Sequence, residues 1–272
     1  MLRLEDFVEQ KLADGFGCFA SGEAKESLGL GAAAFAASAQ RLVRKGKLVH
    51  PRQGFYLILR PEDRAAGAPD PAQWIGPLMQ YQSMDYRISL LRAAARHGAS
   101  HQAAMVFQVV VPRQLRELIA GSHRLQFLFQ SERVFSAVNK PEFLDRLKTS
   151  AGYAQVAGVE LTLLDCARYL HDAGGINGVA QIAKDIGAKA NPRLLAKAAQ
   201  VYEGSVVRRL GYLLEFVGHD KASDALARQA SKAKTYVPLD PSVKPPIPAL
   251  AEEAEKVARW KLLVNEAVET DA

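Results

Sequence analysis

Cationic side chains near the N-terminus are the residues whose type and spacing best suit a chemical task, the binding of phosphate groups. No acidic residue occurs between Glu26 and Glu62. The lysines and arginines of this stretch are Arg41, Arg44, Lys45, Lys47, Arg52 and Arg60. A surface of one sign across neighbouring elements attracts the phosphate backbone of a nucleic acid. The alternative is an ordinary solvated face on a small helical domain that contacts other proteins.

Small and polar side chains around these cations favour duplex DNA as the partner. Ala36 and Ala37 would keep a helix slim enough to enter the major groove, where alanine can touch a thymine methyl group. Gln40 can pair with adenine, and Arg41 can reach O6 and N7 of guanine. The predicted DNA-contacting residues are Ala36, Ala37, Ser38, Gln40, Arg41, Arg44, Lys45, Lys47, Arg52 and Gln53.

Residues that could support catalysis do not form a recognisable motif. The sequence contains no G-x-S-x-G, G-x-x-x-x-G-K-[ST] or G-x-G-x-x-G pattern. His97 and His101 have the spacing of two metal ligands on a helix, but no third ligand is evident nearby, and Gly98 favours a helix end there. Glu160 and Asp165 are better explained as acids at a helix start. We therefore expect no catalytic residues, no metal and no cofactor.

The sequence around the cations predicts a winged helix-turn-helix, whose helices and strands would position them. Ser21 can cap a helix that runs to Leu28, and a glycine-punctuated turn follows at 28–31. A second helix then places an apolar stripe inward, formed by Phe35, Ala39, Leu42 and Val43, and Gly46 ends it. Two strands at 47–50 and 54–58 form a hairpin with a basic tip at 51–53. A supporting helix precedes the unit, with Leu4, Phe7, Val8 and Leu12 on one face.

The whole chain fits two domains and a reducing compartment. It has 272 residues, 49% hydrophobic and 24% charged, with a net charge of +6 and only two cysteines. We predict a winged helix-turn-helix at 1–64, a linker at 65–80 rich in proline, glycine and alanine, and an α/β domain at 81–234. The first residues lack the apolar stretch of a signal peptide, and no part of the sequence approaches 18 consecutive apolar residues. We therefore expect a cytoplasmic protein without a membrane span.

The second domain reads as a mixture of strands and helices, which makes the predicted fold class α+β, with a small sheet and several helices. We expect strands at 105–111 and 124–130, and further strands at 134–138 and 156–159. Helices are expected at 85–98, 161–170, 176–186, 192–203 and 205–217. In the last of these, Arg208 and Arg209 favour one structural salt bridge, with Glu215 or Asp165, and one solvated cation; an anion-binding or partner-binding surface is the alternative.

The last region, 235–272, is predicted to be a proline-rich extended segment followed by a helix at 251–267. Prolines are dense between Thr235 and Pro248 and favour an extended chain that can wrap a surface. The helix is expected to pack on the second domain or across a dimer.

Several stretches, taken in order, resemble the AbiEi family of antitoxins, the transcriptional regulators of AbiE-type toxin–antitoxin systems. They are 41–49 (RLVRKGKLV) with 54–56 (GFY), 86–91 (YRISLL) with Ala94, His97 and Gly98, 162–165 (TLLD) and 206–215 (VVRRLGYLLE). The resemblance covers roughly residues 1–220. The first motif is common among winged-helix proteins, and its combination with the last two is much more specific.

This resemblance implies an N-terminal domain that binds repeats in its own promoter and represses the operon. It also implies a C-terminal domain that counters a nucleotidyltransferase-like toxin, in the manner called type IV, in which the two proteins need not form a tight complex. If toxin antagonism uses a surface, the candidates are Asp165, Arg208, Arg209 and Glu215. The protein is expected to act on double-stranded promoter DNA as a monomer or weak dimer, in phage defence.

Two other functions remain open from the sequence. The first is a ligand-responsive transcriptional regulator with no toxin partner. The second is an enzyme with a helix-turn-helix appendage, such as a nuclease that uses Glu160 and Asp165.

Overall fold

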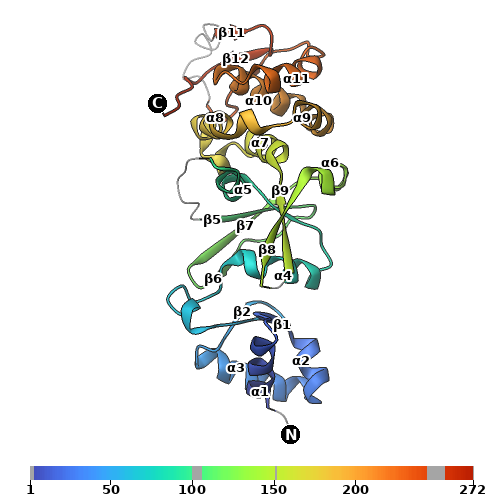
Figure 1. The fold of residues 1–272 in the computed structure, drawn as a ribbon, viewed down its shortest axis with the longest axis vertical. Coiled ribbons are helices and arrows are strands. Elements are labelled where there is room, and N and C mark those ends of the chain that lie inside the picture. Colours follow the sequence, from blue (N-terminus) through green and yellow to red (C-terminus); the bar gives the residue numbers. More distant parts are fainter. Residues whose placement is uncertain (1–2, 100–105, 151, 244–254, 272) are drawn as a thin grey trace. The chain divides into compact units, whose positions relative to one another are not determined.

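The computed structural model describes residues 3–99, 106–150, 152–243 and 255–271 and shows a mixed α/β protein (Figure 1). The chain divides into two compact units. Unit 1 comprises residues 1–88, 105–131 and 146–156, and unit 2 comprises residues 89–104, 132–145 and 157–272. The chain therefore enters each unit more than once, so a single cut near residue 65 does not describe its organisation.

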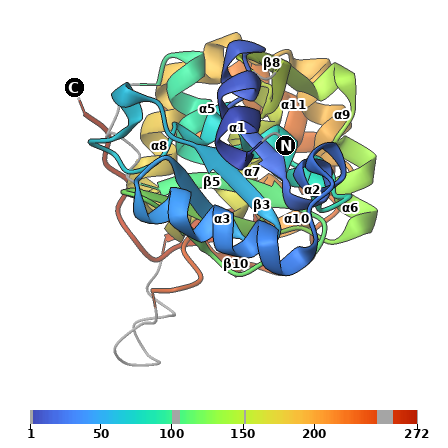
Figure 2. The same ribbon diagram turned by 90° about the horizontal axis from the view of Figure 1, so that it is seen from below.

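Unit 1 begins with three helices and a small sheet. These are α1 (Leu4–Ala13), β1 (Cys18–Ala20), α2 (Ser21–Leu28), α3 (Ala32–Arg44), β2 (Leu48–Arg52) and β3 (Phe55–Ile58). The strands pair antiparallel in the order β1-β3-β2. Figure 2 shows α3 beside this sheet, and Phe35, Leu42 and Tyr56 lie in the shared core.

The ends of these helices follow local sequence signals. Gly29 adopts a left-handed conformation after α2, with φ of 62°. Gly46, with φ of 65°, follows α3, and the Lys47 N–H then bonds to the Leu42 carbonyl at 2.9 Å, as in a Schellman motif. Two details differ from the prediction. Ser21 is the first residue of α2 rather than its cap, and Val43 is 38% exposed because it lies at the edge of the apolar stripe.

A six-stranded sheet forms most of the rest of unit 1. Its strands are β4 (Arg87–Ile88), β5 (Val106–Val111), β6 (Leu118–Ala120), β7 (His123–Phe129), β8 (Leu144–Thr149) and β9 (Gly152–Ala157), in the order β6-β7-β5-β4-β9-β8. β5 runs parallel to β7 and antiparallel to β4. Phe107 and Val109–Val111 are buried, so side chains on both faces of β5 are covered, as its near-continuous apolar run, interrupted only by Gln108, predicts.

The segment 65–80, predicted to be a linker, is folded into unit 1. It contains the short 3₁₀ helix η2 (Pro71–Gln73) and the start of α4 (Ile75–Tyr81), after η1 (Pro61–Asp63). Trp74 and Ile75 are buried, and the Trp74 indole donates to the Pro69 carbonyl at 2.9 Å. The prolines here shape short turns around a buried tryptophan and do not mark a flexible spacer.

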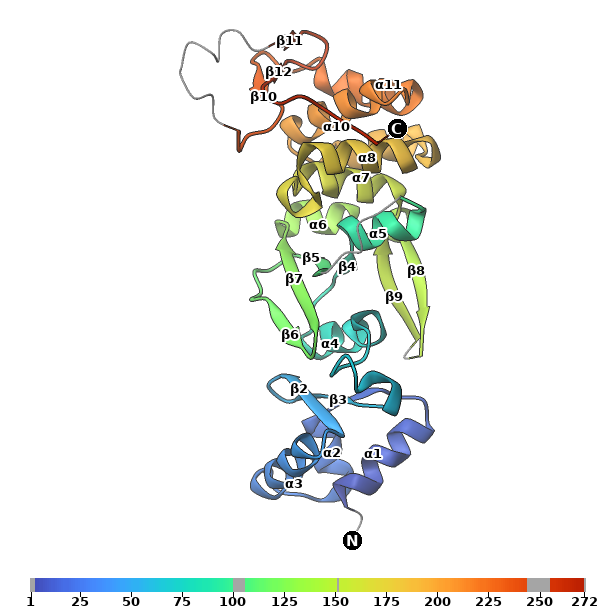
Figure 3. The ribbon, with the colours of Figure 1, turned by 90° about the vertical axis from the view of Figure 1, so that its left-hand side faces the viewer.

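Unit 2 is built around packed helices. They are α5 (Leu90–His97), α6 (Glu132–Val138), α7 (Val159–Arg168), α8 (Gly175–Ile186), α9 (Pro192–Ala199), α10 (Gly204–Phe216) and α11 (Asp220–Ala230), with the 3₁₀ turns η3 (Pro141–Phe143), η4 (His171–Ala173) and η5 (Gly187–Lys189). Figure 3 shows α7, α8 and α10 stacked on one another.

One sequence expectation in this region was wrong, and a second was correct only in part. The segment 134–138 forms helix α6 and not a strand, because Val134, Phe135 and Val138 reach the core with helical spacing. The segment 156–159 is divided between the end of β9 and the start of α7. The helix expected at 161–170 is α7, and every residue from Glu160 to Ala167 is buried, because neighbours cover the helix on all sides.

The C-terminal segment also differs from the prediction of a helix at 251–267. Its described part forms β11 (Glu255–Val257) and β12 (Leu262–Val264), and β12 pairs with both β11 and β10 (Val237–Pro238). Lys261 has φ of 49° between the two strands, and Trp260 is completely buried. The pairing of these strands and the burial of Trp260 outweigh the helical propensity of the alanines and lysines in this segment. Among the described residues, no helix is long and apolar enough to cross a membrane.

Candidate nucleic-acid interface

Helix α3 presents the small and cationic residues predicted for DNA contact on its exposed side. Ala36, Ala37, Gln40, Arg41 and Arg44 are exposed, and Ser38 is half-buried. The opposite side places Phe35, Ala39 and Leu42 in the core. The helix is therefore anchored by one stripe, and its remaining surface is slim at the N-terminal end and positively charged at the C-terminal end.

The charges on this surface are largely uncompensated. Across the described part of the chain, Arg41, Arg44 and Lys45 form no ion pair, and Arg41 donates to the Ser38 hydroxyl at 3.0 Å. Lys47 differs, because its ammonium group lies 2.5 Å from Glu5 and 4.0 Å from Glu9. The hydrogen bond to Glu5 raises the pKa of Lys47 and lowers the pKa of Glu5. Lys47 is thus partly neutralised, and the exposed cations of this stretch without an ion pair among the described residues lie on α3 and at its C-terminal end.

The tip of the β2–β3 hairpin packs within unit 1. The Tyr81 hydroxyl of α4 donates to the Gln53 carbonyl at 3.2 Å, and the Tyr81 ring lies 5.7 Å from the Phe55 ring. Arg52 is half-buried, and its Nε and Nη2 atoms are shielded from solvent and have no hydrogen-bond partner among the described residues. Gln53 is exposed. The predicted contact residues Arg52 and Gln53 therefore lie on a hairpin whose tip contacts Tyr81. The Arg52 guanidinium is less accessible to solvent than the guanidinium groups of Arg41 and Arg44 on α3.

Asp165, a candidate from the second half of the chain, is completely buried in unit 2. Its carboxylate accepts hydrogen bonds from the Ser89 hydroxyl at 2.7 Å and the Tyr202 hydroxyl at 2.6 Å. Glu160 is also buried and accepts from the Asn191 backbone N–H at 2.7 Å. Both carboxylates join separate elements of the core, and Asp165 is not part of an exposed surface.

Arg208 and Arg209 are buried too, which overturns the expectation that one of them is solvated. Arg208 donates to the carbonyls of Thr235 at 2.8 Å and Lys261 at 3.2 Å. Arg209 donates to the carbonyls of Leu239 at 2.6 Å and Ala167 at 3.0 Å. Burial lowers the pKa of each guanidinium, and the carbonyl oxygens offset part of that cost. Both arginines hold the C-terminal segment against α10.

Glu215 completes this attachment. Its carboxylate accepts from the Trp260 indole N–H at 2.8 Å and lies 2.9 Å from the Arg259 guanidinium. The motif at 206–215 thus binds the segment that follows it in the chain. Sequence reasoning could not find this partner, because the C-terminal segment carries no recognisable motif.

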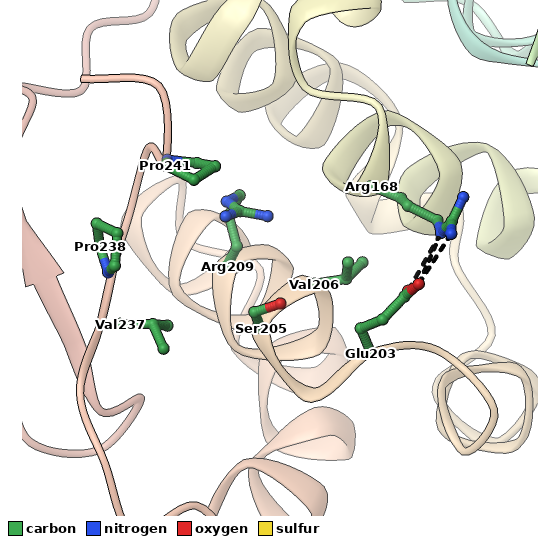
Figure 4. A pocket seen from close by; sticks show the side chains of 8 residues that line it. All are labelled: Arg168, Glu203, Ser205, Val206, Arg209, Val237, Pro238 and Pro241. Atoms are coloured by element: carbon green, nitrogen blue, oxygen red, sulfur yellow. Dashed lines mark hydrogen bonds and ion pairs between the residues drawn. The ribbon is translucent and has the colours of Figure 1, made fainter. Parts of the chain in front are cut away.

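An ion pair that the sequence did not single out borders a cavity beside α10 (Figure 4). Arg168 contacts the Glu203 carboxylate through Nε and Nη2, at 2.8–3.1 Å. Burial raises the pKa of Glu203, but the hydrogen bonds from Arg168 and the backbone outweigh that effect, so the net pKa is lowered. The cavity has a volume of about 530 Å³ and is also lined by Ser205, Arg209, Pro238 and Pro241. Because charged, polar and apolar side chains all line this open cavity, it suits a small polar molecule.

The histidines do not form a metal site among the described residues. His97 ends α5 before Gly98, and its Nε2 lies 2.8 Å from the Ala157 carbonyl oxygen. His101 lies outside the described residues. Within the described ranges no group of three or more His, Cys, Asp or Glu side chains could hold a metal ion.

Comparison with known proteins identifies the central region of the chain. Residues 87–216 match the family model described as the AbiEi antitoxin C-terminal domain. A crystal structure of the RV2827C protein from Mycobacterium tuberculosis has a similar fold, with a TM-score of 0.65 and 17% sequence identity, over 94% of this chain and 89% of that chain. No curated protein matches the sequence at a significant level.

Proposed function

Because residues 87–216 belong to the AbiEi antitoxin family, we propose that this chain is the antitoxin of a toxin–antitoxin operon and represses that operon by binding its promoter. The N-terminal part acts as a winged helix-turn-helix, with α3 as the recognition helix. The toxin it counters is a nucleotidyltransferase-like protein, and the antagonism need not involve a tight complex. The protein is not itself an enzyme, and it acts in the cytoplasm.

The observation that carries the DNA-binding proposal is the exposed face of α3. Its uncompensated cations, Arg41 and Arg44, lie beside alanines that allow close approach to base edges. Lys45 adds a phosphate contact at the end of the helix. The hairpin contributes less, because Tyr81 braces its tip and Arg52 is sheltered. We therefore assign most of the affinity and specificity to α3.

The buried carboxylates support the proposal that the protein has no nuclease activity. Glu160 and Asp165 each accept hydrogen bonds inside the core of unit 2. A carboxylate that holds core elements together is poorly placed to bind a metal ion and a phosphodiester. A divalent-metal-dependent cleavage of DNA that disappears in Asp165→Asn, while the fold is retained, would reverse this assignment.

A gel-shift titration with the DNA upstream of the operon tests the DNA-binding proposal. Several phosphate contacts would make the logarithm of the binding constant fall steeply and linearly with the logarithm of salt concentration. Arg44→Ala with Lys45→Ala should weaken binding to all sequences alike, whereas Gln40→Ala should reduce the preference for the operator. Lys232→Ala, which removes an exposed cation in unit 2, is the matched control. Absence of salt-sensitive binding contradicts the proposal.

The antitoxin role is tested separately by growth. Co-expression with the neighbouring toxin should restore growth, and the Arg44→Ala, Lys45→Ala variant should still protect when both genes are driven by a foreign promoter. Loss of protection by this variant would show that toxin antagonism requires DNA binding, and would contradict the proposal that the two functions are separate.

A ligand-responsive regulator without a toxin is the second candidate function. The cavity beside Arg168 and Arg209 favours it, because two guanidinium groups border a space that a small molecule can enter. A thermal-shift screen against metabolites would separate the two functions, since a specific ligand raises the melting temperature. A hit that also changes operator binding, in a chain that fails to protect against the toxin, would favour the second candidate.

A further inference from the structure

A second groove in unit 2 lies between helices α5 and α8. Its cavity has a volume of about 700 Å³. Residues with small side chains line it, among them Ala94 and Ala95 of α5 and Gly178 of α8. The C-terminal residues Glu269–Asp271 form a further wall, and Figures 1 and 3 both draw the dark red C-terminal segment beside α8.

Side chains of α8 hold this C-terminal segment by its main chain. The Asn177 side-chain oxygen accepts from the Glu269 N–H, and the Gln181 side-chain oxygen accepts from the Asp271 N–H, each at 2.9 Å. The Lys184 ammonium group donates to the Asp271 carbonyl. All three donors and acceptors on α8 lie on one face of the helix, at positions i, i+4 and i+7.

The spacing of these contacts matches the repeat of an extended peptide. Four residues of α-helix rise about 6 Å, and two residues of extended chain span roughly 6.6 Å. Asn177 and Gln181 are four residues apart and bind N–H groups two residues apart. Because the two hydrogen bonds read only backbone groups, they would hold any extended segment in the same register.

We propose that the groove between α5 and α8 is a peptide-binding site for an extended acidic segment of a protein partner, and that the chain's own C-terminal residues occupy it until such a segment displaces them. The resident segment carries Glu269 and Asp271 in the wall of the groove, and the Lys184 ammonium group, which donates to the Asp271 carbonyl, places a positive charge beside them. A cavity remains beside it although it is in place, so the resident fills only part of the site. This inference is independent of DNA binding by α3.

A pair of proline substitutions in the full chain can release the resident segment without changing any residue of α5 or α8. Glu269→Pro with Asp271→Pro removes the two N–H groups that Asn177 and Gln181 bind, because proline lacks a backbone donor. Thr270→Pro is the matched control: within the described part of the chain the Thr270 N–H has no hydrogen-bond partner. The probe is a fluorescent peptide with the sequence of residues 264–272, followed by polarisation.

We expect the peptide to bind the Glu269→Pro, Asp271→Pro chain at least tenfold more tightly than the unchanged chain or the Thr270→Pro control. The tethered segment competes at an effective concentration of the order of millimolar, so it should exclude the peptide when it is intact. Asn177→Ala with Gln181→Ala, added to the released chain, should abolish binding.

Two results would overturn the proposal. One is no binding of the peptide to the released chain at millimolar concentration, and the other is binding that persists after Asn177→Ala with Gln181→Ala. Operator binding, measured on the same variants, should be unchanged in every case. Failure of the peptide experiment with intact operator binding would therefore reject only the peptide site, and failure of operator binding alone would reject only the role of α3.

Discussion

The ring of Trp260 lies directly against the backbone of Gly211, so closely that a Cβ atom on residue 211 would overlap the ring carbons. Gly211 lies within α10, where glycine is normally unfavourable, and Trp260 comes from the turn between β11 and β12. The absence of a side chain at Gly211 thus leaves the space that the ring of Trp260 fills. Arg208, Arg209 and Glu215 hold the same segment around this contact.

Gly211→Ala should therefore destabilise the protein, although alanine is the better helix former. Overpacking a filled core costs about 1–3 kcal/mol, which outweighs the roughly 1 kcal/mol that alanine gains over glycine in a helix. Urea unfolding of unit 2 measures the change in the free energy of unfolding. Gly204→Ala is the control, since a Cβ there meets no atom within 4 Å. Equal stability of the two variants would contradict the importance of the Trp260 contact.

Asp165→Ala should also lower stability, because it leaves the hydroxyls of Ser89 and Tyr202 without their acceptor. An unsatisfied buried polar group costs about 1–3 kcal/mol. Tyr202→Phe removes one donor and should cost less than Asp165→Ala. In the double variant the losses should be less than additive, since the two residues share one hydrogen bond. Strict additivity in denaturant unfolding would argue against this network.

The ion pair between Glu203 and Arg168 should make stability depend on pH. The pKa of Glu203 is lowered below its ordinary value of 4.5 in the folded chain. A lowered folded-state pKa contributes stability that is present above the unfolded pKa and is lost as pH falls through the folded pKa. Glu203→Gln should hence be less stable than the unchanged chain at pH 7, and the difference should shrink below about pH 4.5. Unfolding measured at several pH values would reveal a constant difference if the pair were unimportant.

Lys45 and Lys47 should differ in their effect on operator binding, although only one residue separates them. Lys45 is exposed and forms no ion pair among the described residues, although its charge also helps to lower the pKa of Glu5, whereas Lys47 is directly paired with Glu5 and Glu9. Each phosphate contact contributes about 0.9 to the slope of log K against log salt. Lys45→Ala should reduce that slope by about one contact, and Lys47→Ala by less. Equal slopes for the two variants would contradict the difference predicted between the two lysines.

The N-terminal elements could be predicted from the sequence because local signals specify them. Glycines at 29 and 46 end α2 and α3 by adopting left-handed conformations, and the spacing of Phe35, Ala39 and Leu42 fixes which side of α3 is buried. The exposed positions of Ala36, Ala37, Gln40 and Arg41 follow directly. The strand at Val106–Val111 was likewise evident from its β-branched run. In these stretches each residue's preference agrees with its tertiary environment.

Only the tertiary structure decided what Asp165, Arg208 and Arg209 do. Arg208 bonds to the Gly204 carbonyl within its own helix, but the other partners described above lie 27 to 76 residues away in sequence. No local pattern records which distant carbonyl or hydroxyl will be brought to these side chains. The predictions of a linker at 65–80 and of a helix at 251–267 were wrong for the same reason. Trp74 and Trp260 are buried by long-range packing, which places the neighbouring chain against the core. Periodicity reports which side of an element is apolar, but long-range packing determines which polar groups become buried and what satisfies them.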